Sequence, residues 1–428
     1  MPAIVADLTP LRESRDFRRL VLGNVVTGLG TQAALVALPY QLYVETGSAF
    51  LVGLLGAVEL APLIVMALWG GALADRADRR RLLLLDQIGL VVCAALLAGV
   101  TFALDEPPIW SLYVLAGALA GFGAVQNVVR SAIVPNLVEP GQLKNALALS
   151  YGLFNLTVVL GPALGGLMIG WLGVGSAYVA DGVSCLAMVV AALALPPQPP
   201  LGLVEGAAHP PVLESIREGL AFVRREDALM GSFAIDLMAM AFGMPRALFP
   251  VLALDVFHAG PEGAGLLAAS VSAGAVVAAL TTGWMAHARR LGRIVLWAVA
   301  AWGAAIALAG ISGSLWLAVA LFAVAGAADS VSAVCRQAIT QTVTPDHLRG
   351  RMSSVFSLVV TSGPRLGDVE SGTVAGLAGP RFSVVSGGAA CVVGVAAIAV
   401  AFPALRRYDS EQAEAEAAAR SLAAAPAG

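Results

Sequence analysis

Charged residues are scarce in this chain. Of its 428 residues only 12% are Asp, Glu, Lys or Arg, whereas 58% are hydrophobic. Soluble domains carry roughly 25% charged residues, so a soluble globular protein is excluded. The formal net charge of -3 says little, because in a membrane protein the placement of charge matters more than its sum.

Several signatures of chemistry are also missing. Lys144 is the single lysine, and no GxxxxGK pattern followed by Ser or Thr is present, so we expect no nucleotide hydrolysis. Neither HExxH nor GxSxG occurs, which argues against an enzyme. No basic cluster alternates with aromatic residues, which argues against nucleic acid as a partner. We expect no cofactor.

Cysteine and histidine are rare. The four cysteines lie in apolar stretches without CxxC spacing, so neither a metal site nor a disulfide framework is indicated. The four histidines fall in loops or at the ends of apolar runs. A proton relay inside the membrane would therefore need carboxylates.

Long apolar runs dominate what is present, and about 20 apolar residues suffice to cross a bilayer as a helix. Six spans are predicted in the first half: 20–43, 50–73, 82–104, 109–129, 146–172 and 175–195. Six more follow in the second half: 228–257, 263–286, 294–311, 315–334, 352–377 and 382–402. The sequence predicts an all-α integral membrane protein of twelve transmembrane helices.

Arginines are unevenly distributed among the connections. They precede spans 1 and 7 and follow spans 2 and 8, whereas the alternate loops carry acids; Arg381 is the exception. Basic residues are retained on the cytoplasmic side. We therefore expect a multi-pass protein of the plasma (inner) membrane with both termini in the cytoplasm.

Prolines mark a boundary between two halves. Six of them lie between Pro196 and Pro211, which indicates a linker. We expect an N-terminal half over 1–195, a cytoplasmic linker over 196–227, a C-terminal half over 228–402 and a cytoplasmic tail over 403–428. Ile216, Leu220 and Val223 share one helical face, which fits an interfacial helix and fits a solvated linker helix equally well.

The two halves repeat each other. GPALGG at 161–166 recurs as GPRLGD at 363–368, and Arg130, Ala132 and Ile133 recur as Arg336, Ala338 and Ile339. Further matches occur in spans 1, 2, 7 and 8, in the same order. Parallel six-helix repeats predict a substrate site between the halves near the bilayer midplane.

The loop after span 2 reads GGALADRADRRR, from Gly70 to Arg81. It resembles the signature loop of the major facilitator superfamily, and the DRADRRR form resembles the branch of siderophore exporters and drug–proton antiporters. The resemblance implies a twelve-helix fold and a gating role for Gly71, Asp75, Arg76, Arg79 and Arg80. A second, degenerate copy runs from Gly283 to Arg293, and in it His287 stands at the place of Asp75. A plain positive-inside loop is the alternative.

The motif GPALGG in span 5 resembles the antiporter motif of the same superfamily, which implies export. Its residues are Gly161, Pro162, Gly165 and Gly166. The upstream glycines of that motif are replaced by Thr157 and Ala148. A kinked helix that only packs closely on a neighbour stays an alternative.

Charged residues inside the spans are candidates for proton coupling, because they are costly in a membrane. The candidates are Asp368, Arg365, Glu370, Asp236, Asp329 and Glu59; Asp181 and Arg246 lie nearer the outer ends. Arg365 and Asp368, at i and i+3, share a helix face, so we expect Arg365 to poise Asp368. Structural ion pairs are the alternative.

Uncharged polar residues inside the spans are candidates for the substrate cavity. They are Asn24, Gln32, Gln126, Asn127 and Asn155. Each could instead form a hydrogen bond between packed helices.

The sequence thus predicts a secondary active transporter that functions as a monomer, with a small-molecule substrate, protons and the lipid bilayer as its partners. By resemblance it is a proton-coupled exporter of small amphipathic compounds such as siderophores or drugs. The alternatives are an uptake symporter, a membrane enzyme, and a sensor or scaffold that transports nothing.

Overall fold

The computed structural model describes residues 8–74, 76–199, 212–281, 283, 285, 288–345 and 348–413. Within this part of the chain the regular elements are all helices. Asp75, His287 and His347, on which some of the expectations bear, lie outside the described residues.

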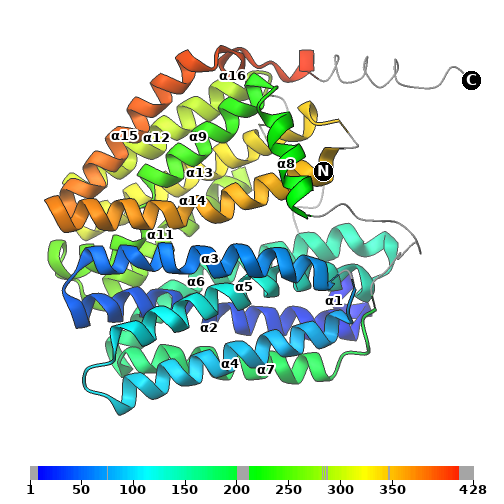
Figure 1. Cartoon of the computed structure of the whole chain (residues 1–428), viewed down its shortest axis with the longest axis vertical. Helices are drawn as coiled ribbons and strands as arrows, with labels where there is room; N and C mark the ends of the chain where they lie inside the picture. Colours follow the sequence, from blue (N-terminus) through cyan, green and yellow to red (C-terminus); the bar gives the residue numbers. More distant parts are fainter. Residues whose placement is uncertain are drawn as a thin grey trace, which may run out of the picture. The chain divides into compact units, whose positions relative to one another are not determined.

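The first half contains one short helix and six long ones (Figure 1). They are α1 (Thr9–Glu13), α2 (Arg15–Thr46), α3 (Ala49–Ala74), α4 (Arg79–Ala103), α5 (Ile109–Leu137), α6 (Leu143–Leu172) and α7 (Val174–Leu193), with η1 (Pro140–Gln142) before α6. α6 ends at Gly173, whose φ of 82° is readily adopted only by glycine. The six predicted spans of this half correspond to α2 through α7.

The second half begins with the linker helix α8 (Val212–Val223) and continues through the remaining spans. Its elements are α9 (Asp227–Gly243), η2 (Arg246–Leu248), α10 (Phe249–Val251), η3 (Leu252–Val256), α11 (Gly260–Thr281), α12 (Leu291–Ile311), α13 (Leu315–Val343), α14 (Arg349–Ala378), α15 (Pro380–Ala401) and α16 (Pro403–Arg407). α14 ends at Gly379, with a φ of 92°, much as α6 ends at Gly173. The internal repeat is therefore visible in the backbone at these two corners.

Eleven helices of the described chain are long and apolar enough to cross a membrane. The helix over the predicted eleventh span, α14, has 30 residues but is not among the eleven. Arg365, Asp368 and Glu370 lower its hydropathy, while its length of about 45 Å exceeds the ~30 Å of a hydrocarbon core.

The seventh span is broken, contrary to the continuous helix predicted over 228–257. α9 stops at Gly243, and after Pro245 the chain continues through a 3-10 turn, one short α-helical stretch and a π-helical turn. Pro245 and Pro250 have no amide hydrogen to donate, which explains the interruption. The break exposes backbone groups that side chains of other helices can bind.

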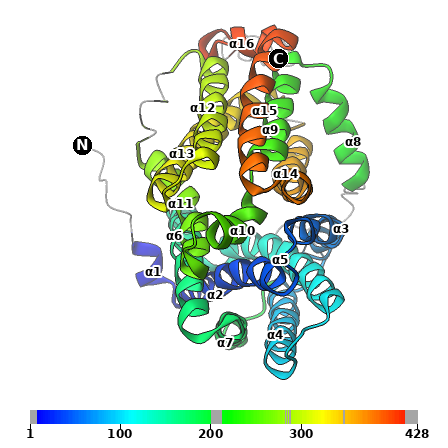
Figure 2. The ribbon, with the colours of Figure 1, turned by 90° about the vertical axis from the view of Figure 1, so that its left-hand side faces the viewer.

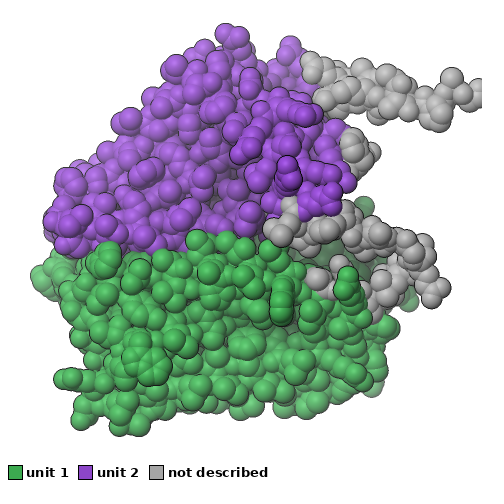
Figure 3. Space-filling model, viewed as in Figure 1, with its two compact units in different colours: residues 1–207, 249–269 green, residues 208–248, 270–428 purple. Residues whose placement is uncertain are grey.

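The chain divides into two compact units (Figure 3). Unit 1 comprises residues 1–207 and 249–269, and unit 2 comprises 208–248 and 270–428. The segment after the break in span 7 thus belongs to unit 1, where the Tyr43 hydroxyl donates a hydrogen bond to Asp255. The core of unit 1 is built around Phe17, Leu83 and Ile133, and that of unit 2 around Leu229, Val295 and Ile339.

The linker helix α8 packs against α14, as Figure 2 shows. A Cβ added to Gly219 would come within 2.6 Å of Val355 Cγ2 and 3.0 Å of the Arg351 carbonyl oxygen. Arg351 Nη1 lies 2.7 Å from Glu218 Oε2. Val223 is buried, whereas Leu220 is exposed. The face predicted for a membrane surface is therefore partly occupied by protein contacts.

We expect Gly219→Val to weaken the docking of α8, because the added methyl groups cannot fit against the α14 backbone. Trypsin cleavage at Arg217 and Arg224 should then become several-fold faster in native conditions, as measured by gel densitometry. Glu214→Val, at an exposed position of the same helix, serves as the control. Equal cleavage rates in the two variants would contradict the packing described here.

Candidate functional site

The most deeply buried ion pair of unit 2 joins α9 to α13. Arg336 Nη1 lies 2.6 Å from Asp236 Oδ1, and the two side chains are only 5% and 4% exposed. Taking both charges out of water is costly, so either one left alone at this depth would be strongly destabilising. The pair therefore accounts for the presence of both residues in apolar helices.

Arg336 also faces a second acid. Its Nη2 atom lies 3.9 Å from Asp329 Oδ1, and the Asp329 side chain is 34% exposed. Two carboxylates thus share one guanidinium, which leaves a net charge of -1 when both are ionised. A single proton on either acid makes the group neutral. This arrangement brings Asp236 and Asp329, both singled out from the sequence, into one site.

Asp368 on α14 is bound by residues of the break in span 7. Arg246 Nη2 donates to its Oδ2 at 2.7 Å, and the Ala247 amide donates to its Oδ1 at 3.1 Å. The i, i+3 spacing pointed to Arg365, and the structure shows that Arg246 binds Asp368 directly. In a continuous helix the Ala247 amide would bond to a carbonyl of its own helix. The break leaves this amide and Arg246 available to Asp368.

Three other charged candidates lie on α3 and α14 and are partly buried: Glu59, Arg365 and Glu370. Glu370 Oε2 is buried and has no hydrogen-bond partner among the described residues. An unsatisfied buried carboxylate oxygen costs folding free energy, and such groups are often retained for function.

Unit 1 contains a buried acid near a buried arginine, and the sequence reasoning did not single them out as charges inside the membrane. Asp86 on α4 is 3% exposed and interacts electrostatically with Arg130 on α5. Gln87 Nε2 donates to Asp86 Oδ2 at 3.1 Å, while Arg130 Nε and Nη2 are buried without a hydrogen-bond partner in the described chain. Arg130 is the repeat counterpart of Arg336. That match was the signal that could have pointed to an acid facing Arg130.

The glycines of the antiporter-type motif mark helix crossings within unit 1. A Cβ on Gly165 would lie 2.7 Å from Ala33 Cα of α2. One on Gly166 would lie 2.6 Å from the Pro261 carbonyl oxygen and 3.0 Å from Gly265 Cα, both on α11. Gly161 packs on Gln32, and Pro162 lies inside α6. The motif therefore lets α6 approach two helices at backbone distance.

The arginine-rich loop is tied to helix ends of its own half. Arg80 donates from Nε to the Ala192 carbonyl at 3.0 Å and from Nη2 to the Leu193 carbonyl at 2.8 Å, at the end of α7. Arg79 donates to the Ala132 carbonyl of α5 at 2.8 Å. The carbonyls bound by Arg80 lie in the last turn of α7, where positive groups satisfy orphan carbonyls and the helix dipole. Arg76 is exposed.

Gly70 and Asp78 make the packing contacts of this loop. A Cβ at Gly71 would meet no described atom within 4 Å, whereas one at Gly70 would lie 3.3 Å from Val125 Cα. The close approach of helices is therefore made by Gly70. Asp78 caps α4 by accepting from the Arg80 amide at 2.9 Å, and it accepts from the Gln198 amide at 2.9 Å.

The uncharged candidates for the substrate cavity differ in their surroundings. Gln126 is 5% exposed, and its Nε2 has no hydrogen-bond partner among the described residues, as is true of Asn24 Oδ1. Asn155 Nδ2 donates to the Tyr151 carbonyl at 2.9 Å, which is a bond within one helix. Asn127 is exposed, and Gln32 is half-buried. Asn24 and Gln126 thus retain hydrogen-bonding capacity.

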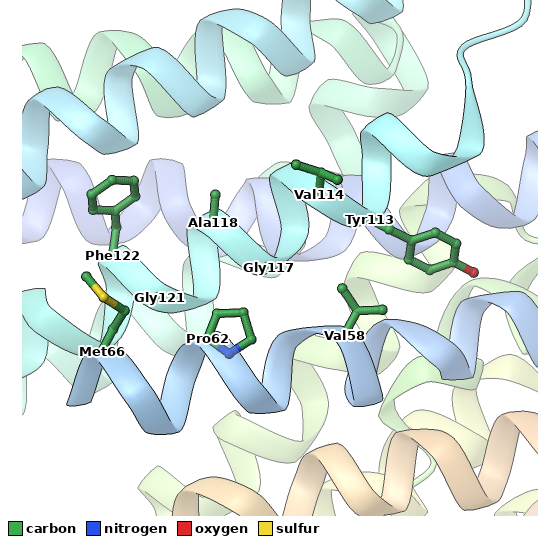
Figure 4. A pocket seen from close by; sticks show the side chains of 9 residues that line it. All are labelled: Val58, Pro62, Met66, Tyr113, Val114, Gly117, Ala118, Gly121 and Phe122. Carbon is green, nitrogen blue, oxygen red and sulfur yellow. The ribbon is translucent and has the colours of Figure 1, made fainter. Parts of the chain in front are cut away.

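An apolar pocket of about 360 Å³ lies between α3 and α5 (Figure 4). Figure 4 shows Pro62 and Met66 of α3 on one side and Phe122 of α5 on the other. The hydroxyl of Tyr113, its most polar lining residue, donates to the Leu51 carbonyl at 2.7 Å. Sites for polar ligands need several convergent polar groups, so this pocket suits hydrocarbon.

We expect Gly166→Val to disrupt the crossing of α6 with α11, because overpacking at backbone distance costs about 1–3 kcal/mol. The midpoint of thermal unfolding in detergent should fall by several degrees. Gly152→Val on the same helix is the control, since a Cβ there meets no described atom within 4 Å. A Gly166→Val protein as stable as the control would refute this role.

Curated relatives match nearly the whole chain. Enterobactin exporter EntS of Shigella boydii serotype 4 is 29% identical over 413 residues, covering 94% of this chain and 95% of the relative. Enterobactin exporter EntS of Citrobacter koseri is 29% identical over 400 residues, covering 91% and 92%.

Solved structures share the fold at low identity. The nucleoside transporter NupG matches with a TM-score of 0.72 and 14% identity, covering 92% of this chain and 99% of that one. A bacterial homologue of the iron transporter ferroportin matches with a TM-score of 0.65 and 16% identity, covering 92% and 99%. At these identities the likeness establishes the fold alone.

The family model described as transmembrane secretion effector matches residues 5–425. Together with the helix pattern and the internal repeat, this match shows that the chain belongs to the transmembrane secretion effector family of the major facilitator superfamily, whose members are secondary transporters.

Proposed function

We propose that this chain exports small amphipathic compounds from the cytoplasm in exchange for protons, and that a single copy suffices. The relatives named as enterobactin exporters support export and make catecholate siderophores the first substrates to test. The family description as a secretion effector points in the same direction. No ATP-binding pattern occurs in the sequence, so an ion gradient must supply the energy.

The observation that carries proton coupling is the sharing of Arg336 between Asp236 and Asp329. Asp236 is fully buried and holds the arginine at 2.6 Å, while Asp329 is one-third exposed and lies farther away at 3.9 Å. Asp329 is therefore the more exposed of the two acids. A proton on Asp329 would leave a neutral Arg336–Asp236 pair, and its loss would draw Arg336 toward both acids.

Such a change is suited to coupling because it alters what holds α13 to α9. Asp329 and Arg336 both belong to α13, seven residues apart, while Asp236 belongs to α9. If Arg336 moves between Asp329 on its own helix and Asp236 on α9, the strength of the link between α13 and α9 changes. Asp368, bound to Arg246 and the Ala247 amide, is a second candidate and ties α14 to the break in span 7.

We expect Asp329→Asn to abolish substrate accumulation driven by a pH gradient, because the amide cannot carry a proton between the two sides. Exchange of labelled for unlabelled substrate without a gradient should persist. The measurement is uptake of catecholate siderophores and fluorescent drugs into inside-out vesicles. Asp368→Asn, tested beside it, distinguishes the two candidate acids.

The control for this experiment is Asp227→Asn, which makes the same change at an exposed position in the first turn of α9. Gradient-driven accumulation at the wild-type rate in Asp329→Asn would eliminate Asp329 as the coupling acid. Loss of accumulation in Asp368→Asn alone would assign the role to Asp368.

We also propose that the protein lies in the inner membrane with both termini in the cytoplasm. The excess of arginine in the loops before span 1 and after span 2 supports this orientation.

Single cysteines test the orientation directly, in a protein whose buried Cys93, Cys185, Cys335 and Cys391 are first replaced by serine or alanine. Glu106→Cys should react with a membrane-impermeant maleimide in intact cells, whereas Arg76→Cys should react only after the membrane is opened. Both positions are exposed, so lack of labelling reports the side of the membrane. The reverse labelling pattern would invert the topology.

A further inference from the structure

A groove of about 770 Å³ lies among α11, α12 and α13 in unit 2. Its volume falls within the roughly 300–1,000 Å³ of small-molecule sites. Each helix contributes a stripe of mostly small or aliphatic residues at helical spacing: Val277, Ala278 and Thr281; Ile294, Trp297, Ala298 and Ala301; Val324, Ala327, Ala328 and Val331. The alanines on α12 and α13 leave the hollow that larger side chains would fill.

The groove is open to the surface that faces lipid. Trp297 is 77% exposed, Val277 is 62% exposed and Val324 is 53% exposed. These helices cross a membrane by length and composition, so water does not cover such apolar side chains. Trp297 lies nearly two turns after the first residue of α12 and so beside the apolar part of the groove.

Two arginines line one end of this apolar groove. Arg290 precedes the first residue of α12, and Arg293 lies in its first turn. The side chain of neither residue is paired with an acid in the described chain, whereas Arg289 beside them is bound by Glu411 at 2.5 Å. No acid lines the groove among the described residues. No side chain caps the N-terminus of α12, so the positive end of its helix dipole adds to the positive potential of the two arginines.

The dimensions match one lipid chain in one leaflet. From Arg290 to Ala301 the groove follows eleven residues of α12, or about 16 Å at 1.5 Å per residue. Half of a ~30 Å hydrocarbon core is about 15 Å. A phosphate held at Arg290 and Arg293 would thus place an acyl chain along the groove down to the bilayer midplane.

We propose that this groove, which we call the α11–α13 groove, binds an anionic glycerophospholipid. Arg290 and Arg293 hold its phosphate, and one acyl chain packs along Trp297, Ala298 and Ala301. Basic sites between transmembrane helices at a membrane surface select anionic headgroups. The apolar pocket between α3 and α5 has no charged lining residue and should not distinguish headgroups.

The test is native mass spectrometry of the delipidated protein with added long-chain phosphatidylglycerol, phosphatidylcholine or soluble glycerol 3-phosphate. We expect phosphatidylglycerol to be retained in preference to phosphatidylcholine, and glycerol 3-phosphate not to displace it. Each arginine near a membrane surface contributes about 5-fold in affinity for anionic lipid, so Arg290→Ala/Arg293→Ala should lose about 30-fold.

Two further variants make the result specific. Arg406→Ala/Arg407→Ala removes the same charge from exposed positions of α16 and should retain the lipid preference. Ala301→Leu fills the inner end of the groove without changing charge and should weaken binding of the long-chain lipid several-fold, with the unfolding midpoint as a folding check.

Equal retention of the two lipids, displacement by glycerol 3-phosphate, or unchanged binding in Arg290→Ala/Arg293→Ala would each overturn the proposal. Binding is measured on the purified protein without transport, so failure here leaves the proposed export untouched. Loss of transport in the coupling variants would likewise leave the lipid site standing.

Discussion

A charge buried among membrane-spanning helices must be neutralised by the protein itself, and this constraint shapes both units. Arg336 is held by Asp236 between α13 and α9. Asp368 is held by Arg246 and by the backbone amide of Ala247 at the break of span 7. In unit 1 the buried Asp86 of α4 interacts electrostatically with Arg130 of α5. The pairs of Arg336 with Asp236 and of Arg246 with Asp368 join helices that are distant in sequence, so any change in protonation bears on helix packing.

Glycines allow the helices to approach each other closely. Gly165 and Gly166 let α6 meet α2 and α11 at distances that exclude a Cβ atom, and Gly219 does the same for α8 on α14. In lipid no hydrophobic force drives helices together, so such contacts carry much of the packing energy. The glycines of the antiporter-type motif therefore contribute to the helix packing of unit 1, independently of any effect on the direction of transport.

The two copies of the arginine-rich loop have diverged in what they contact. In the first copy Arg79 and Arg80 turn toward carbonyl groups at the ends of α5 and α7 and so brace the protein. In the second copy Arg290 and Arg293 line a groove open to lipid. Arginine thus binds backbone carbonyl groups in the first half. In the second half arginine leaves positive charge available at the membrane surface.

The sequence by itself determined the class of protein, the helix pattern and the repeat. Apolar runs of about 20 residues leave the backbone no alternative to helices in a membrane, and arginine placement and the two GP-L-G motifs are local features. It also singled out Asp236, Asp329 and Asp368 as costly residues. These three acids stand out in the sequence because a charge inside a membrane span is costly.

Only the tertiary structure decided which charges meet. Helical spacing suggested Arg365 for Asp368, but the partner Arg246 is 122 residues away and became available because Pro245 and Pro250 interrupt span 7. Asp86 interacts electrostatically with Arg130 of a neighbouring helix, which spacing along one helix does not indicate. Gly70 makes the close contact with α5 because helix rotation selects the face. Pairing between helices depends on rotation, register and breaks, which arise from packing and are not encoded in any short stretch of sequence.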